Sequence, residues 1–217
     1  MRTSAGSLAL MVVLVGCSAP VSGTPTAQPS PVATVTMLGG LSALRWGDGP
    51  YGVVLLHDAD HDAAAWAMLA HALAADGMTV LAPQATNSKA LRTAIQALRS
   101  ARQDQPSPAI ERVAVIAAGD AIGAVFALAA SDPTVIDQVI LVSPESDARW
   151  TAEFPKLFVA ATDSAQAPVA RRAEGSATGQ WNALLIVEGG GMGQALFEGA
   201  AGGELVTAVV RRLDERR

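Results

Sequence analysis

From about residue 34 onward, short apolar runs alternate with segments in which apolar residues recur at helical spacing. Runs of five to eight β-forming residues predict buried strands, at 51–56, 78–82, 112–117, 135–142, 157–161 and 183–187. Trp66, Leu69, Ala70 and Leu73 recur at i, i+3, i+4 and i+7, which predicts a helix that ends near Gly77. Further helices are predicted at 91–98, 121–130, 165–172 and 204–213.

This alternation predicts an α/β fold, with a mostly parallel sheet flanked by helices on both faces. Residues 34–46 add one or two edge strands, and no segment is long enough to form a lid domain. In such sheets, functional sites lie beyond the carboxyl ends of the strands. We therefore expect any site of this chain in the loops that follow the strands.

The N-terminus has the pattern of a targeting segment. Arg2 is followed by an apolar run at 8–15, which is far shorter than the ~20 residues of a membrane span. The segment 14–17, Leu-Val-Gly-Cys, resembles a bacterial lipobox. The resemblance implies a signal peptide at 1–16, a lipid on Cys17 and a place on the extracytoplasmic side of a bacterial membrane. The alternative is an ordinary secretory signal that happens to end near a cysteine.

Residues 17–33 follow as an uncharged stretch rich in proline, serine and threonine. This composition is typical of a disordered tether, so the predicted domain covers 34–217. The formal net charge of −5 argues against binding to nucleic acid. No glycine-rich phosphate-binding motif occurs, and we expect no cofactor.

Residues 113–124, VAVIAAGDAIGA, form an apolar strand, a glycine-containing turn and a small-residue helix. The segment resembles the nucleophile elbow of the α/β-hydrolases, G-x-S-x-G, in which a sharp turn presents a serine. Gly119 and Gly123 keep the glycine spacing, but the central position holds Ala121. Residues 53–58, VVLLHD, and 157–163, LFVAATD, resemble two further strand ends of the family. Together they suggest a minimal dienelactone-hydrolase-like or esterase-like core, with another doubly wound fold as the alternative.

The resemblance implies a triad in the order serine, acid, histidine. Ala121 stands at the nucleophile position, and the acid position falls on Asp163, or on Ser164 if the register shifts by one. Met192 stands where the family has its histidine, and no histidine follows His71. We therefore interpret the triad as degenerate.

The family's oxyanion hole is made of backbone N–H groups, which can survive sequence change. The resemblance places these donors at Ala59 and Ile122, with His57 and Asp120 beside them in the pocket. We therefore expect a site for a small carbonyl or carboxylate ligand.

The densest polar cluster is the segment His57-Asp58-Ala59-Asp60-His61-Asp62. Two histidines and three carboxylates could form a metal site. We favour instead a capping role for Asp60 or Asp62 at the next helix, and predict no metal. Asp120, one residue before the expected apex, and Ser143, at a strand end, are weaker candidates for catalysis.

The sequence leads to three functional hypotheses, of which the third is a structural one, a cell-envelope scaffold with a closed pocket. The first is a membrane-tethered lipoprotein whose hydrolase-like domain has no hydrolase activity and binds a ligand or a partner. The second is an active esterase-type enzyme that uses an unusual site near His57 and His61.

Overall fold

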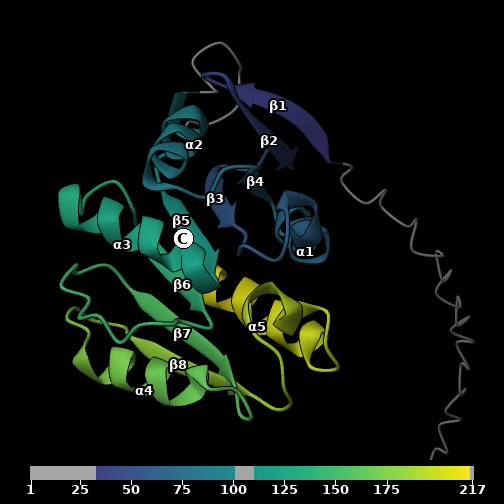
Figure 1. Ribbon diagram of the computed structural model, residues 1–217. Helices are drawn as coiled ribbons and strands as arrows, with labels where there is room; N and C mark the ends of the chain where they lie inside the picture. Colours follow the sequence, from purple (N-terminus) through teal and green to yellow (C-terminus); the bar gives the residue numbers. More distant parts are fainter. Residues whose placement is uncertain (1–32, 101–109, 216–217) are drawn as a thin grey trace, which may run out of the picture.

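The computed structural model describes residues 33–100 and 110–215. Eight strands form one sheet in the order β1-β2-β4-β3-β5-β6-β7-β8 (Figure 1). Their bounds are β1 Thr34–Leu38, β2 Leu41–Trp46, β3 Tyr51–Leu56, β4 Met78–Pro83, β5 Val113–Ala118, β6 Gln138–Val142, β7 Lys156–Ala161 and β8 Ala183–Val187. Strands β1 and β2 run antiparallel to their neighbours, and the pairs from β4 to β8 are parallel. The predicted sheet is confirmed, with the two edge strands expected at 34–46.

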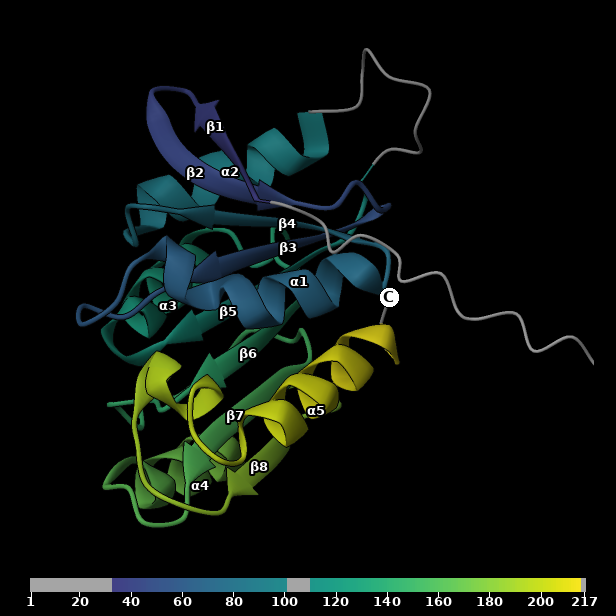
Figure 2. The same cartoon turned by 90° about the vertical axis from the view of Figure 1, so that its right-hand side faces the viewer.

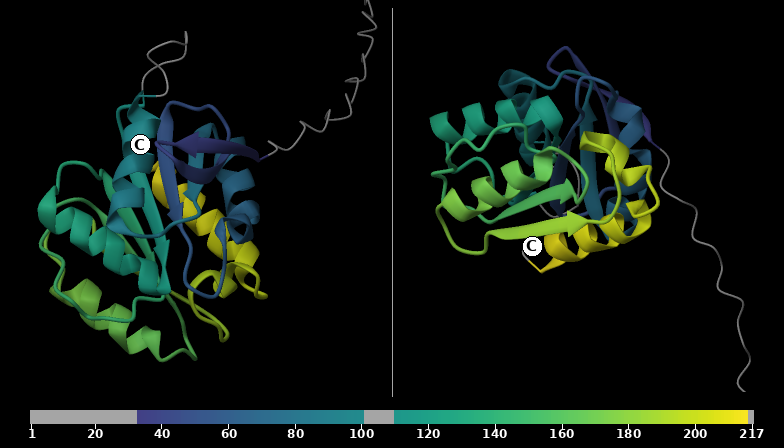
Figure 3. Two further views of the ribbon diagram at one scale, coloured as in Figure 1. Left: turned by 45° about the horizontal axis from the view of Figure 1, so that its top comes forward. Right: turned by 60° about the horizontal axis from the view of Figure 1, so that its bottom comes forward.

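Five α-helices cover the sheet, three on one face and two on the other (Figures 1 and 2). The first face carries α2 Ser88–Ser100, α3 Ile122–Ser131 and α4 Gln166–Ser176. The second carries α1 Ala67–Ala75 and α5 Gly202–Asp214. Short 3₁₀ helices stand at Ala63–Trp66 (η1), Gly119–Ala121 (η2) and Gly193–Phe197 (η3). The β1–β2 hairpin and β8 form opposite edges of the sheet (Figure 3).

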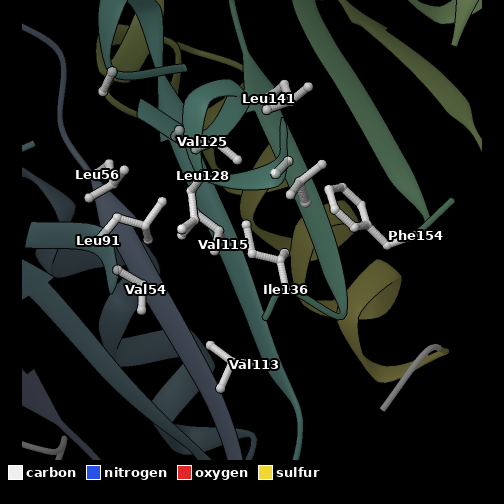
Figure 4. Packing of buried hydrophobic residues seen from close by; sticks show 14 of the residues in the cluster. Val54, Leu56, Leu91, Val113, Val115, Val125, Leu128, Ile136, Leu141 and Phe154 are labelled. Carbon is white, nitrogen blue, oxygen red and sulfur yellow. The ribbon is translucent and has the colours of Figure 1, made fainter. Parts of the chain in front are cut away.

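The core is divided by the sheet into two layers because side chains alternate along each strand. On β5, Val113, Val115 and Ala117 pack under α2 and α3 (Figure 4). Ala114, Ile116 and Ala118 pack on the other face, under α1 and α5. The central strands are buried on both faces, so they have continuous apolar sequences.

Two features of the fold bear on the site. The chain between β6 and β7, residues 143–155, contains no helix or strand. Within 33–100 and 110–215, no helix is both long and apolar enough to cross a membrane. The predicted signal peptide, Cys17 and nearly all of the tether lie outside the described residues.

Candidate functional site

A cavity of about 380 Å³ lies beyond the carboxyl ends of the parallel strands. Loops that follow β3, β5, β6 and β8, together with the start of α4, form its wall. The lining residues are Asp58, Ala59, Asp60, His61, Gly119, Asp120, Ser143, Glu145, Gln166, Met192, Gly193 and Ala195. The position agrees with the general location of sites in parallel α/β sheets.

The sharp turn after β5 lies at Gly119, not at Ala121 as we expected from the glycine spacing. Gly119 has φ +50°, in the left-handed region that side chains disfavour. Ala121 has φ −63° and ψ −17°, which are helical values, and its side chain is buried in the core. The apex therefore lies two residues earlier, directly after the last residue of β5.

The sequence contained a signal for this register. Ala117 and Ala121 flank Gly119 at the same two-residue spacing that Gly119 and Gly123 have around Ala121. The turn has alanine at both flanking positions, so the glycine pair was a misleading guide to its register.

The apex position faces the cavity but has no side chain. A Cβ at position 119 would lie 3.1 Å from the Cβ of Asp58 and 3.8 Å from Oε1 of Glu145. The position that corresponds to a nucleophile thus points at carboxylates, and glycine offers no atom that could attack a carbonyl.

The two amides expected to form an oxyanion hole are already hydrogen-bonded. The N–H of Ala59 donates to Oδ1 of Asp120 over 2.9 Å. The N–H of Ile122 donates to the carbonyl oxygens of Asp120 and Gly119. The expectation that both amides remain open to a ligand is therefore corrected. The amide of Ala59 is bonded to the carboxylate of Asp120, and the amide of Ile122 is bonded within the turn.

Met192 lines the cavity from the loop after β8 and is 51% exposed. Two residues later, the N–H of Gln194 donates to Oδ2 of Asp58 over 2.9 Å. Gly193 lies so close to Asp58 that a Cβ there would clash with the same carboxylate oxygen. The loop after β8 is thus hydrogen-bonded to the loop after β3. At the position where a histidine base is expected, the side chain is the thioether of Met192.

Asp163 does not reach the cavity. It is exposed in the turn after β7, where its backbone N–H donates to the carbonyl oxygen of Gly189. The neighbouring Ser164 turns its hydroxyl back to the carbonyl oxygen of Ala161. Neither residue lines the cavity, so the site contains no acid from this strand.

The two histidines of the 57–62 segment have different surroundings. Both ring nitrogens of His57 face backbone carbonyl oxygens, those of Asp58 and Gln84, and His57 is not part of the cavity wall. This corrects its expected place in the pocket. His61 lies in the wall, with Nδ1 2.5 Å from Oδ1 of Asp58. The hydrogen bond to Asp58 raises the pKa of His61 above its usual value, against the opposing effect of burial.

The remaining aspartates of the segment divide between capping and cavity. Asp62 accepts hydrogen bonds from the backbone N–H groups of Ala64 and Ala65, and so caps η1 as predicted. Asp60 lines the cavity. Among the described residues, no group of three or more histidine, cysteine or acidic side chains is arranged to hold a metal ion.

Ser143 is a candidate that the sequence only weakly indicated. It follows β6, has φ +55°, and is 1% exposed. Its hydroxyl has no hydrogen-bond partner among the residues described, and neither has Oε1 of Gln166, which also lines the cavity. A buried polar atom without a partner is costly, so both atoms require an explanation.

Acidic side chains dominate the electrostatics of the cavity. Asp58, Asp60, Asp120 and Glu145 line it together with His61, and its wall includes no lysine or arginine. In the described part of the chain, Asp60, Asp120 and Glu145 make no ion pair within 4.0 Å. An acidic wall repels an anion, which argues against the carboxylate ligand expected from the sequence.

Comparison with known proteins places the fold. No protein-family model and no curated protein sequence matches the chain. Similar solved structures include a dienelactone hydrolase from Anabaena variabilis, with a TM-score of 0.67 and 19% identity over 87% of this chain and 97% of that one. A hormone-sensitive lipase from a metagenome library has a TM-score of 0.68 and 13% identity, over 88% and 87% of the two chains. A monoacylglycerol lipase from Paleococcus ferrophilus has a TM-score of 0.66 and 13% identity, over 82% and 99%. The chain has the α/β-hydrolase fold.

Proposed function

We propose that this protein is a lipid-anchored α/β-hydrolase-fold protein without hydrolase activity, which uses its cavity to bind a ligand. The observation that carries the proposal is the cavity itself. The position at the apex of the strand-to-helix turn is Gly119, the expected histidine position is Met192, and the amide of Ala59 is occupied by Asp120. Glycine has no nucleophilic side chain, methionine cannot act as a base, and the amide of Ala59 is not free to act as an oxyanion donor.

The size of the loss supports a role in binding. Removal of the nucleophile or the base from a triad costs on the order of 10⁶ in turnover, and removal of both costs little more. What remains, roughly 10³–10⁴ over water, comes from the oxyanion hole and binding. With the amide of Ala59 already hydrogen-bonded to Asp120, even that remainder is reduced.

Ester turnover tests the proposal. The purified protein is assayed with p-nitrophenyl acetate and butyrate beside the variants Ser143→Ala and His61→Ala. We expect the three proteins to give the same rate, equal to the rate of the buffer-catalysed reaction. Turnover by the natural protein that either substitution abolishes would overturn the proposal.

A restored site tests the assignment of the apex. The variant Gly119→Ser/Met192→His supplies a hydroxyl and an imidazole, and Asp120→Ala added to it frees the amide of Ala59. Because one oxyanion donor is worth about 10²–10³ in turnover, we expect the triple variant to exceed the double variant by about 10²-fold. Ala121→Ser/Met192→His/Asp120→Ala is the matched control and should stay inactive, since residue 121 is buried in the core. Activity in this control instead of the Gly119 variant would contradict the register.

Attachment to the extracytoplasmic face of the membrane is part of the proposal and rests on the sequence around Cys17. Metabolic labelling with a radioactive fatty acid in a bacterial host should label the natural chain and leave Cys17→Ala unlabelled. A natural chain that carries no label and is recovered in the soluble extracytoplasmic fraction would identify an ordinary secretory signal instead.

One observation favours a second candidate, an esterase with a displaced triad. His61 contacts Asp58 through Nδ1, as the histidine of a triad contacts its acid, and the unpartnered hydroxyl of Ser143 lines the same cavity. Covalent labelling of Ser143 by a fluorophosphonate, lost in His61→Ala, would support this candidate. The first proposal predicts that no serine is labelled.

A further inference from the structure

The acidic cavity adjoins a second one of about 280 Å³. Gly119, Asp120 and Glu145 belong to the walls of both. The second wall continues through Ile122, Phe126 and Trp150, whose two aromatic rings meet edge to face at 5.3 Å. The site therefore has an acidic compartment and an apolar compartment joined at the strand-to-helix turn.

Most carboxylates of the acidic compartment have no cationic side chain of the described residues close to them. Asp58 is paired with His61, but Asp60, Asp120 and Glu145 have no cationic neighbour within 4.0 Å among the residues described. Carboxylates that share a concave wall raise the local concentration of cations and exclude anions. The compartment thus selects a ligand by its positive charge.

Two buried atoms in the same wall indicate that the ligand is a hydrogen-bond donor. The hydroxyl oxygen of Ser143 and Oε1 of Gln166 are buried, belong to residues of the cavity wall, and have no partner in the described part of the chain. Both atoms accept hydrogen bonds. An ammonium group has three donors, and could satisfy these acceptors together with a carboxylate.

The apolar compartment restricts the rest of the ligand. Phe126 is 37% exposed although it is a large aromatic residue on a helix, and it forms part of this wall. An apolar or aromatic group placed there would remove that surface from water, which is favourable in proportion to the area covered. A bare inorganic cation would leave this compartment unfilled.

We propose that the paired cavities bind a small organic amine with an apolar or aromatic body. The ammonium group lies among Asp60, Asp120 and Glu145, and the body lies against Phe126 and Trp150. This inference deepens the proposed function, because it names the ligand class of a site that we take to be non-catalytic.

Calorimetric titration of the purified protein tests the ligand class. The probe is phenethylamine at neutral pH, compared with 2-phenylethanol, phenylacetate and ethylamine. Compared with phenethylamine, 2-phenylethanol has no charge, phenylacetate has a negative charge, and ethylamine has no aromatic ring. We expect phenethylamine to bind at least tenfold more tightly than each of the three.

Matched variants locate the binding site. Glu145→Gln should weaken the binding of phenethylamine by about tenfold, because one charge-assisted hydrogen bond is lost. The affinity for 2-phenylethanol should not change. Glu111→Gln removes the same charge before the amino end of β5, at the end of the strands opposite the cavity, and should have no effect on the binding of phenethylamine. Phe126→Ala should weaken the binding of phenethylamine and leave the affinity for ethylamine unchanged.

Three results would overturn the inference: no binding of phenethylamine at millimolar concentration, equal or tighter binding of phenylacetate, or equal weakening by Glu145→Gln and Glu111→Gln. Thermal denaturation of each variant verifies that it is folded. Ester turnover is measured on the same samples. Turnover would overturn the proposed function alone, whereas binding of the acid by an inactive protein would overturn the ligand class alone.

Discussion

The substitution Asp58→Asn is expected to destabilise the protein in a way that depends on pH. Asp58 is buried and joins two loops that are far apart in sequence. One carboxylate oxygen accepts a hydrogen bond from His61, 2.5 Å away, and the other accepts the backbone N–H of Gln194. Asparagine has nearly the same shape but carries no charge, and its amide can preserve at most part of this arrangement.

The expected magnitude follows from the two hydrogen bonds. A hydrogen bond to a charged group contributes about 1.5–3 kcal/mol. Because asparagine can still accept from Gln194, we expect a net loss of about 2 kcal/mol. In a domain of this size, that corresponds to a decrease in Tm of about 4–8 °C.

The pH dependence comes from His61, whose pKa is raised by the bond to Asp58. Because the pKa of His61 is higher in the folded protein, its protonation stabilises the fold fully below the pKa of the unfolded chain, about 6.5. This stabilisation is lost as the pH rises through the pKa of the folded protein. The difference in Tm between the natural protein and Asp58→Asn should therefore be larger at pH 5.5 than at pH 9. A smaller difference persists at pH 9, because the N–H of Gln194 still prefers a carboxylate.

Differential scanning calorimetry at the two pH values measures this difference. Asp163→Asn is the matched control, since Asp163 is exposed in a different loop. Its Tm should equal that of the natural protein at both pH values. An identical loss at pH 5.5 and pH 9 in Asp58→Asn would refute the coupling between Asp58 and His61.

Two further substitutions test the fold around the site. Lys156 is buried on β7 and donates to the carbonyl oxygens of Ala152, Phe154 and Thr178, and burial lowers its pKa to about 8. Between about pH 8 and pH 10.5 the unfolded chain binds more protons, so the free energy of unfolding should rise with pH there, and Lys156→Met should abolish that rise. Gly193→Ala should lower the free energy of unfolding by at least about 1–2 kcal/mol, because φ is +54° and the new Cβ clashes with Asp58. Gly190→Ala has open space around it and should change little; an equal loss in both alanine variants would contradict this explanation.

The elements of the fold could be predicted closely from the sequence. The strand expected at 183–187 is β8 Ala183–Val187, and the helix expected at 204–213 falls within α5 Gly202–Asp214. These segments have strong local signals, because burial on two faces or on one helical face imposes a pattern on neighbouring residues. Among the strands, the least accurate boundary was at β6, where the apolar residues Val135 and Ile136 precede the strand and pack in the core without joining it.

The site was predicted less well. The expected pocket residues Ala59 and Asp120, and Met192 at the expected histidine position, all line the cavity. The apex was misplaced by two residues, and His57 and Asp163 lie outside the cavity wall. Backbone φ at a turn and the direction of a loop side chain depend on what the turn packs against, which residue spacing does not record.

The sequence by itself determined which side chains stand at the candidate triad positions. Whether the apex is Gly119 or Ala121, neither residue carries a hydroxyl, and no histidine follows His71. Only the tertiary structure decided which polar contacts form at the site. Asp120 reaches the amide of Ala59 across 61 residues, and Asp58 reaches the amide of Gln194 across 136. These contacts form because parallel strands bring the loops at their carboxyl ends together, whatever their separation along the chain.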